Sequence, residues 1–224
     1  MSYGSQWHLL RYLGYHRQKL NRLVGNAIGG EVVEWLDMRF NNSSDSIDRE
    51  WRGLDFLNEL HPVQKEWREF WPHSGNLHNW DAVGRTRIDG IEQWVLVEAK
   101  AHLDEMRSSC AAIEQDGGQR DQIRAAFAET KTSMKISPAQ DWLQPYYQYA
   151  NRLSTLYFLT KHNIPARLLF VYFCGDKNPH GNCPTDKAGW QERLTEASTH
   201  LGLNGRSPYE RKIHKLFLPV CPAV

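Results

Sequence analysis

The stretch that decides the fold of this chain is residues 79–102, NWDAVGRTRIDGIEQWVLVEAKAH. Two runs rich in β-branched and aromatic residues, 80–88 and 93–101, are separated by a short segment that contains Asp89-Gly90. An Asp-Gly pair between two such runs is a strong signal for a tight β-hairpin. We therefore predict two antiparallel strands here.

The second of these strands ends in two opposite charges, Glu98 and Lys100. Side chains alternate along a strand, so both charges would lie on the same face. Charges at the end of an apolar strand are costly to desolvate unless they pair, bind a metal or open onto a cleft. The alternative is a strand end that emerges into solvent, as most Lys and Glu side chains do.

Asp81 lies on the first arm of the same predicted hairpin. Antiparallel pairing across the turn would bring it back beside Glu98. Two close carboxylates repel each other unless a proton or a cation lies between them. Mg²⁺ prefers oxygen ligands and is commonly held by one or two carboxylates, so a divalent cation is the expected occupant.

Asp81, followed after the hairpin by Glu98-Ala99-Lys100, resembles the Asp…Glu-x-Lys signature of the PD-(D/E)XK nuclease superfamily, which has a restriction-endonuclease-like fold. The core of that family is a helix, three antiparallel strands, a helix and a strand. The resemblance covers about residues 26–174 and is tightest over 79–102. It departs from the family at Trp80, where the motif has proline.

The resemblance implies an α/β fold with a mixed central sheet flanked by helices (αβββαβ), to which the helical periodicity of the first residues adds an extra N-terminal helical region. It implies a nuclease that hydrolyses phosphodiester bonds, with DNA as the expected nucleic acid. Asp81 and Glu98 would hold Mg²⁺ or Mn²⁺, and Lys100 would orient the attacking water or stabilise the developing charge. The alternative is a catalytically inactive protein of the same fold that binds nucleic acid or a protein partner.

The family also has an acid on its first helix, which we place at residues 26–40. Glu31 and Glu34 are the candidates there, with Glu31 preferred, and Glu66 and Glu69 on a later helix are rivals. The alternative for each of the four is a solvated helix face.

A long helix is predicted over residues 141–162, and its Gln148 and Arg152 resemble a Gln-rich motif of some family members. These residues are four apart and share a helix face. They would contact DNA phosphates or base edges, whereas a hydrated polar stripe is the alternative.

Two further groups of residues carry weaker signals. His102 shares the strand face of Lys100 and would shape the site or serve a structural role. Cys174, His180 and Cys183 suggest zinc, but they lack a close cysteine pair and a fourth ligand at a recognisable spacing.

The remaining elements follow from hydrophobic periodicity and turn signals. Helices are predicted at 6–23 (as one or two helices), 51–60, 62–70, 119–135 and 187–201. Strands are predicted at 167–174 and 212–220, and polar loops at 41–46 and 175–185. We predict a single domain over 1–224, with a mainly helical part (1–75), a nuclease-like core (76–174) and a C-terminal helix and strand (175–224).

The composition is that of a globular protein, with 41% hydrophobic and 24% charged residues. The net charge of +1 excludes binding of nucleic acid by bulk charge, although both ends are basic and the early middle is acidic. No run of about 18 apolar residues is present, so we expect no membrane-spanning helix. The first 20 residues contain no uninterrupted apolar run followed by a small-residue cleavage site, so we do not expect secretion; together with the four scattered cysteines this favours a cytoplasmic protein with reduced thiols. Dimers are common among proteins that make paired cuts, so a homodimer stays open.

Overall fold

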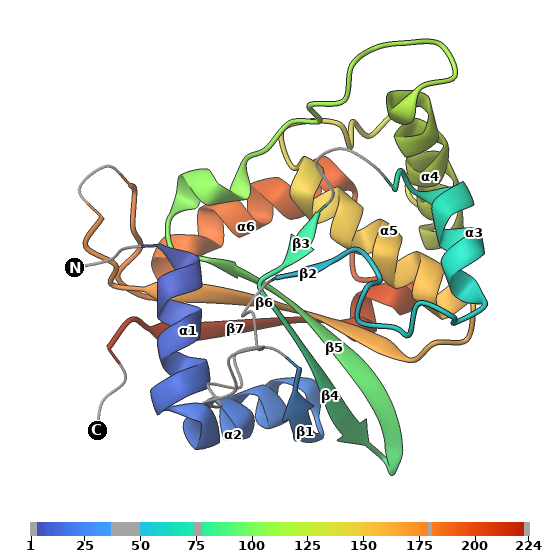
Figure 1. Cartoon of the computed structure of the whole chain (residues 1–224). Coiled ribbons are helices and arrows are strands. Elements are labelled where there is room, and N and C mark those ends of the chain that lie inside the picture. Colours follow the sequence, from blue (N-terminus) through green and yellow to red (C-terminus); the bar gives the residue numbers. More distant parts are fainter. Residues whose placement is uncertain (1–3, 37–49, 74–77, 179–180, 222–224) are drawn as a thin grey trace.

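A five-stranded mixed β-sheet forms the centre of the computed structural model, which describes residues 4–36, 50–73, 78–178 and 181–221. The strand order is β1-β4-β5-β6-β7, shown in Figure 1. The first three strands pair antiparallel, and β6 and β7 continue the sheet in parallel. The strands are β1 (Glu31–Trp35), β4 (Ala82–Ile88), β5 (Ile91–Lys100), β6 (Ala166–Cys174) and β7 (Ile213–Pro219).

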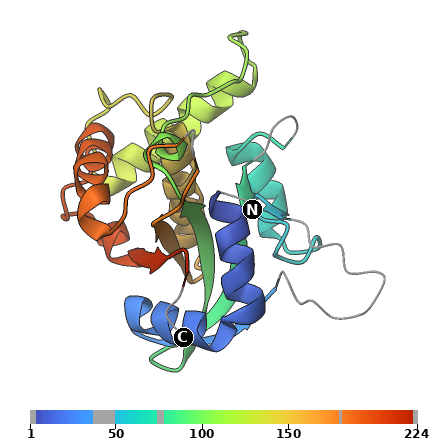
Figure 2. The same ribbon diagram turned by 90° about the vertical axis from the view of Figure 1, so that its left-hand side faces the viewer.

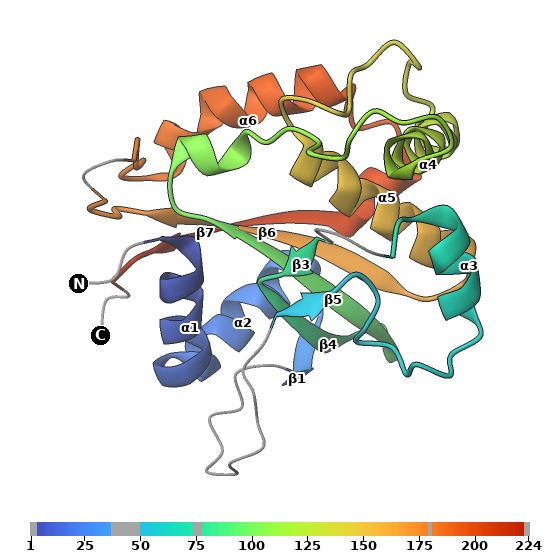
Figure 3. The ribbon, with the colours of Figure 1, turned by 45° about the horizontal axis from the view of Figure 1, so that its top comes forward.

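Helices cover both faces of this sheet (Figures 2 and 3). On one face lie α1 (Ser5–Tyr15) and α2 (Arg17–Ile28), and their apolar side chains pack against Val95 and Val97 of β5. The opposite face is covered by α5 (Tyr147–Lys161) and α6 (Lys187–Leu201), while α3 (Val63–Phe70) and α4 (Gln119–Met134) pack against α5. Strand β5 is therefore buried on both sides, which explains its continuous apolar run.

Short elements complete the described chain. β2 (Trp51–Arg52) and β3 (Asn79–Trp80) form a separate two-stranded sheet. The 3₁₀ helices η1 (Leu103–Met106) and η2 (Pro208–Lys212) follow β5 and precede β7. In the part of the chain that the structure describes, no helix has the length and apolar character needed to cross a membrane.

The hairpin prediction is confirmed. Ile88 pairs with Ile91, and the two turn residues between them, Asp89 and Gly90, have φ values of 50° and 79°. Positive φ at both central positions is what a type I′ turn requires, and its twist matches that of the flanking strands. This register places Ala82 opposite Val97, so the residues just before β4 lie beside the end of β5.

The predicted helix over 26–40 is wrong. α2 ends at Ile28 because Gly29 adopts a left-handed conformation with φ 72° and caps it, and the next described residues form strand β1. A glycine just past a helix is a stop signal, and the β-branched Val32 and Val33 suit a strand that pairs with β4. Residues 37–40 lie outside the described residues.

Gly30 lies so close to β4 that a larger residue does not fit. A Cβ atom there would lie 2.5 Å from the backbone oxygen of Arg87 and 2.5 Å from Cγ1 of Ile88. We expect Gly30→Ala to lower the free energy of unfolding by about 1–3 kcal/mol, measured by urea denaturation. Asn26→Ala, on the exposed side of α2, is the control and should change stability by about 0.5 kcal/mol or less. Equal stability of the two variants would contradict the close approach of Gly30.

The predicted helix over 51–60 is also wrong, because the chain pairs as β2 and then turns at Gly53, which has φ 47°. The predicted helix over 141–162 begins later, at Tyr147, since Pro145 disfavours helical geometry in the residue before it. The segment 6–23 forms two helices, α1 and α2. The loop predicted at 41–46 lies outside the described residues.

The helices predicted at 62–70, 119–135 and 187–201 and the strands predicted at 167–174 and 212–220 are confirmed to within one or two residues. An α/β fold with a mixed sheet flanked by helices is therefore confirmed. Along the chain, α2, β1, β4, β5, α5 and β6 occur in the order helix, three antiparallel strands, helix, strand, with β2, α3 and β3 inserted before β4 and with η1 and α4 inserted before α5. The sheet joins segments from all three predicted parts of the chain.

Candidate functional site

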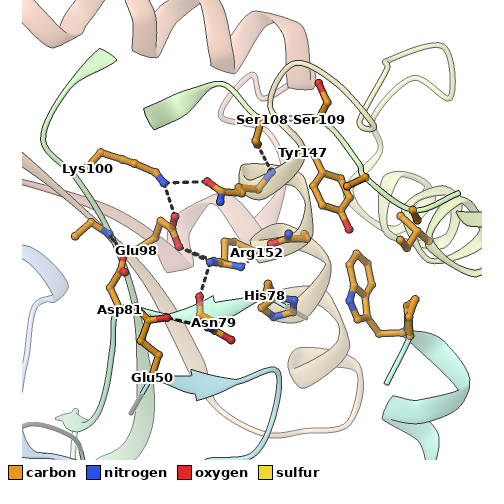
Figure 4. A pocket seen from close by; sticks show the side chains of 18 of the residues that line it. Glu50, His78, Asn79, Asp81, Glu98, Lys100, Ser108, Ser109, Tyr147 and Arg152 are labelled. Carbon is orange, nitrogen blue, oxygen red and sulfur yellow. Dashed lines mark hydrogen bonds and ion pairs between the residues drawn. The ribbon is translucent and has the colours of Figure 1, made fainter. Parts of the chain in front are cut away.

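All five residues predicted for the site line one pocket of about 530 Å³ (Figure 4). The pocket lies at the C-terminal end of β5, where β3, the start of β4 and the first turns of α5 meet. The five residues are Asp81, Glu98, Lys100, Gln148 and Arg152. They come from segments far apart in the sequence.

Asp81 is held in place by β5. Its backbone N–H donates to the carbonyl oxygen of Val97 (3.1 Å), and its Oδ2 accepts a hydrogen bond from the backbone N–H of Ala99 (2.6 Å). The hairpin register thus brings the Asp81 carboxylate to the strand segment that carries Glu98. Among the described residues Asp81 forms no ion pair.

Glu98 is buried, with 5% of its surface exposed, and both of its oxygens are engaged. Oε1 lies 2.7 Å from Nζ of Lys100. Oε2 accepts hydrogen bonds from Nε (2.8 Å) and Nη2 (2.5 Å) of Arg152. The Glu98 carboxylate therefore contacts two cations inside the chain.

Gln148 and Arg152, expected to contact DNA, both make contacts within the pocket. Oε1 of Gln148 accepts a hydrogen bond from Nζ of Lys100 (2.9 Å). Arg152 is only 3% exposed, and its Nη2 also donates to the carbonyl oxygen of Asn79 (2.6 Å). Its role as a direct nucleic-acid contact stays a prediction.

The electrostatics of the two carboxylates differ. Burial, together with the nearby charge of Glu98, raises the pKa of Asp81 to about 7. Burial also acts to raise the pKa of Glu98, but Arg152 and Lys100 outweigh it, so that pKa lies below its ordinary value. Near neutral pH Glu98 is thus ionised, whereas Asp81 titrates.

His78 lies in the same pocket (Figure 4). Its burial, with a smaller contribution from the charge of Arg152, lowers its pKa well below the ordinary value, so the ring is neutral. Its Nε2 lies 3.3 Å from the hydroxyl oxygen of Thr155. His78 therefore adds no positive charge to the pocket.

The four acids predicted to join the site do not line this pocket. On β1, Glu31 pairs with Arg87 and Glu34 pairs with Arg85, and both pairs are partly exposed. Glu66 and Glu69 lie on the exposed side of α3. The first-helix placement of Glu31 fails because residues 31–35 form a strand.

Besides Asp81 and Glu98, a further acid lines the pocket: Glu50, which we did not predict from the sequence. Trp51 of β2 pairs with Trp80 of β3, so continuing the register by one residue brings Glu50 opposite Asp81. Its oxygens accept hydrogen bonds from Nε2 of Gln6 (3.0 Å) and Nδ2 of Asn79 (2.8 Å). No sequence signal indicated it, because a two-residue strand leaves no periodic pattern.

Asp81 provides the test of whether the pocket suits a divalent cation. It is a buried carboxylate without a paired cation among the described residues, and burial, together with the nearby charge of Glu98, raises its pKa. Within the described ranges, no three His, Cys, Asp or Glu side chains are grouped to hold a metal ion. Mg²⁺ needs only one or two carboxylates when water and phosphate oxygens complete its shell, so the donors fit that cation.

The weaker candidates lie outside this arrangement. Nε2 of His102 lies 3.3 Å from Oε1 of Glu105, beyond the end of β5. Of the three residues considered for zinc, Cys174 and Cys183 have free thiols, and His180 lies outside the described residues.

The interpretation of the pocket rests on its geometry. Comparisons of the chain with protein-family models, with curated proteins and with solved structures gave no match.

Proposed function

We propose that this chain is a divalent-cation-dependent nuclease of the PD-(D/E)XK type that hydrolyses phosphodiester bonds, with DNA as its substrate. The observation that carries the proposal is the meeting of Asp81, Glu98 and Lys100 in one pocket. Two carboxylates and a lysine at the buried end of a central strand are a suitable set for phosphoryl chemistry.

The fold supports the same proposal. The order α2, β1, β4, β5, α5, β6 matches the helix, three antiparallel strands, helix and strand that the resemblance implies. Glu98 and Lys100 stand at the end of β5, the third of these strands, and Asp81, just before β4, lies beside them, as in the family's motif. Glu50, immediately before β2, lies in the segment between β1 and β4.

The chain's own residues have separate roles in this proposal. Asp81 and Glu98 would hold Mg²⁺ or Mn²⁺, and Glu50 would add negative charge to the wall of the pocket. The bound cation supplies Lewis-acid polarisation of a phosphoryl oxygen and a lowered pKa for its bound water. Lys100 places a positive charge where negative charge develops on the phosphate.

Cleavage of DNA by purified protein with Mg²⁺ tests the proposal. We expect Asp81→Asn and Lys100→Met each to lower the rate by about 10²–10³-fold, because each removes one charge that the reaction needs. Lys65→Met on the exposed side of α3 should cleave at the wild-type rate, and EDTA should stop all cleavage. Equal rates in all variants would refute the site assignment.

A second candidate function is a catalytically inactive binding module of the same fold. The observation that favours it is the engagement of both Glu98 oxygens by Lys100 and Arg152, which neutralises that carboxylate within the chain. Calorimetry with Mg²⁺ and with DNA separates the two functions. DNA binding without cation affinity and without cleavage would favour the binding module.

A further inference from the structure

The guanidinium of Arg152 is held from several sides. Nε and Nη2 both donate to Oε2 of Glu98, and Nη1 donates to Oδ1 of Asn151 (2.8 Å). Nη2 also reaches the carbonyl oxygen of Asn79, and the group lies 4.6 Å from the centre of the Trp80 ring. A guanidinium with this many partners cannot turn without leaving buried polar groups unpaired.

The two oxygens of Glu98 therefore differ in how firmly they are held. Oε2 faces Arg152, whose partners leave it no alternative position. Oε1 faces Lys100, whose flexible stem already reaches a second acceptor in Gln148 (2.9 Å). A ligand that takes Oε1 from Lys100 leaves Lys100 hydrogen-bonded to Gln148. A ligand that takes Oε2 would leave Arg152 without its carboxylate.

We propose that Arg152 is a positioning residue of this site, which holds Oε2 of Glu98 inside the chain and presents Oε1 alone to a cation in the pocket. The inference rests on the proposed function, but it assigns Arg152 a role other than the nucleic-acid contact expected from sequence. A cation bound at Oε1 would leave Lys100 with its hydrogen bond to Gln148.

Arg152→Lys tests this role at constant charge. Lysine keeps the positive charge but lacks the planar fork that fixes one carboxylate oxygen with two donors. Groups that orient a metal ligand typically change metal affinity by about 10–100-fold when they are replaced, so we expect Mn²⁺ binding to weaken by that factor. Calorimetry and electron paramagnetic resonance measure it without DNA.

Arg87→Lys is the matched control, because Arg87 also pairs with carboxylates, Glu31 and Glu92, but on the surface rather than in the pocket. It should leave Mn²⁺ affinity unchanged. Should Arg152→Lys fail to fold, Asn151→Ala loosens the same guanidinium and is expected to weaken Mn²⁺ binding several-fold. Wild-type affinity in a folded Arg152→Lys or Asn151→Ala protein would overturn the proposal.

A crystal structure of Arg152→Lys separates this inference from the proposed function. We expect the Glu98 carboxylate to turn away from its wild-type position while the backbone of β5 is unchanged. If wild-type protein binds no Mn²⁺, the proposed nuclease function fails, and the position of Glu98 still decides the role of Arg152. A Glu98 carboxylate that keeps its wild-type position in the Arg152→Lys crystal would contradict the inference.

Discussion

Replacing Glu98 by Gln is expected to lower the free energy of unfolding by about 3–5 kcal/mol near neutral pH. The substitution preserves the shape of the side chain but removes its charge. Arg152 and Lys100, whose side chains are 4% and 13% exposed, then lose the carboxylate that both contact. Breaking a buried pair by removing one partner leaves an uncompensated charge in a medium that solvates it poorly.

Urea denaturation of Glu98→Gln beside Glu92→Gln measures this loss. Glu92 also contacts two arginines, Arg85 and Arg87, but its side chain is 44% exposed. We therefore expect Glu92→Gln to cost about 1 kcal/mol or less, since solvent screens exposed pairs. A similar cost for both substitutions would show that burial does not govern the Glu98 interactions.

Adding Arg152→Met to Glu98→Gln should recover part of the lost stability. The double variant no longer holds an unpaired guanidinium, and the methionine side chain can fill the space beside Trp80. We expect the two substitutions together to cost less than the sum of the single ones, by about 1–3 kcal/mol. Simple additivity would indicate that the two side chains act independently.

The second large effect concerns Asp81, whose replacement by Asn is expected to stabilise the protein above pH 7. The pKa of Asp81 is about 7 in the folded chain, against an ordinary value of 3.8. Between these values the folded state keeps a proton that the unfolded state has lost, so stability falls as pH rises. At pH 8 the full difference corresponds to about 4 kcal/mol as an upper bound.

The asparagine of this variant is neutral at every pH, and its amide oxygen can still accept the hydrogen bond from the backbone N–H of Ala99. We therefore expect the stability of Asp81→Asn not to fall as pH rises in this way, and to equal that of the wild type near pH 4. Denaturation curves at pH 4, 6 and 8 test this, with Asp116→Asn in an exposed segment as the control. Parallel pH profiles for wild type and Asp81→Asn would contradict a raised pKa for Asp81.

Mg²⁺ should offset, in the wild type, the loss of stability that ionisation of Asp81 causes at high pH. A cation beside Asp81 stabilises its ionised form, so added Mg²⁺ is expected to raise the melting temperature at pH 8 and to have less effect on Asp81→Asn. A cation that binds only the folded state stabilises it by mass action. This measurement reports cation binding at the pocket without any substrate.

Much of the sheet could be predicted because its signals are local. The turn at Asp89-Gly90 and the doubly buried strand β6 depend on a few neighbouring residues. Strand β1 was misread as helix because its apolar residues also suit a helical stripe. The stop signal at Gly29 and the pairing with β4 decided against the helix.

By itself, the sequence determined that Asp81, Glu98 and Lys100 lie near one another, because one hairpin carries all three. Only the tertiary structure decided what surrounds them. Arg152, 54 positions beyond Glu98, neutralises that carboxylate, and the two-residue ladder of β2 and β3 places Glu50 in the pocket. Alternation and turn chemistry act over a few residues, whereas charge compensation in a buried site depends on contacts between segments that only the packed fold brings together.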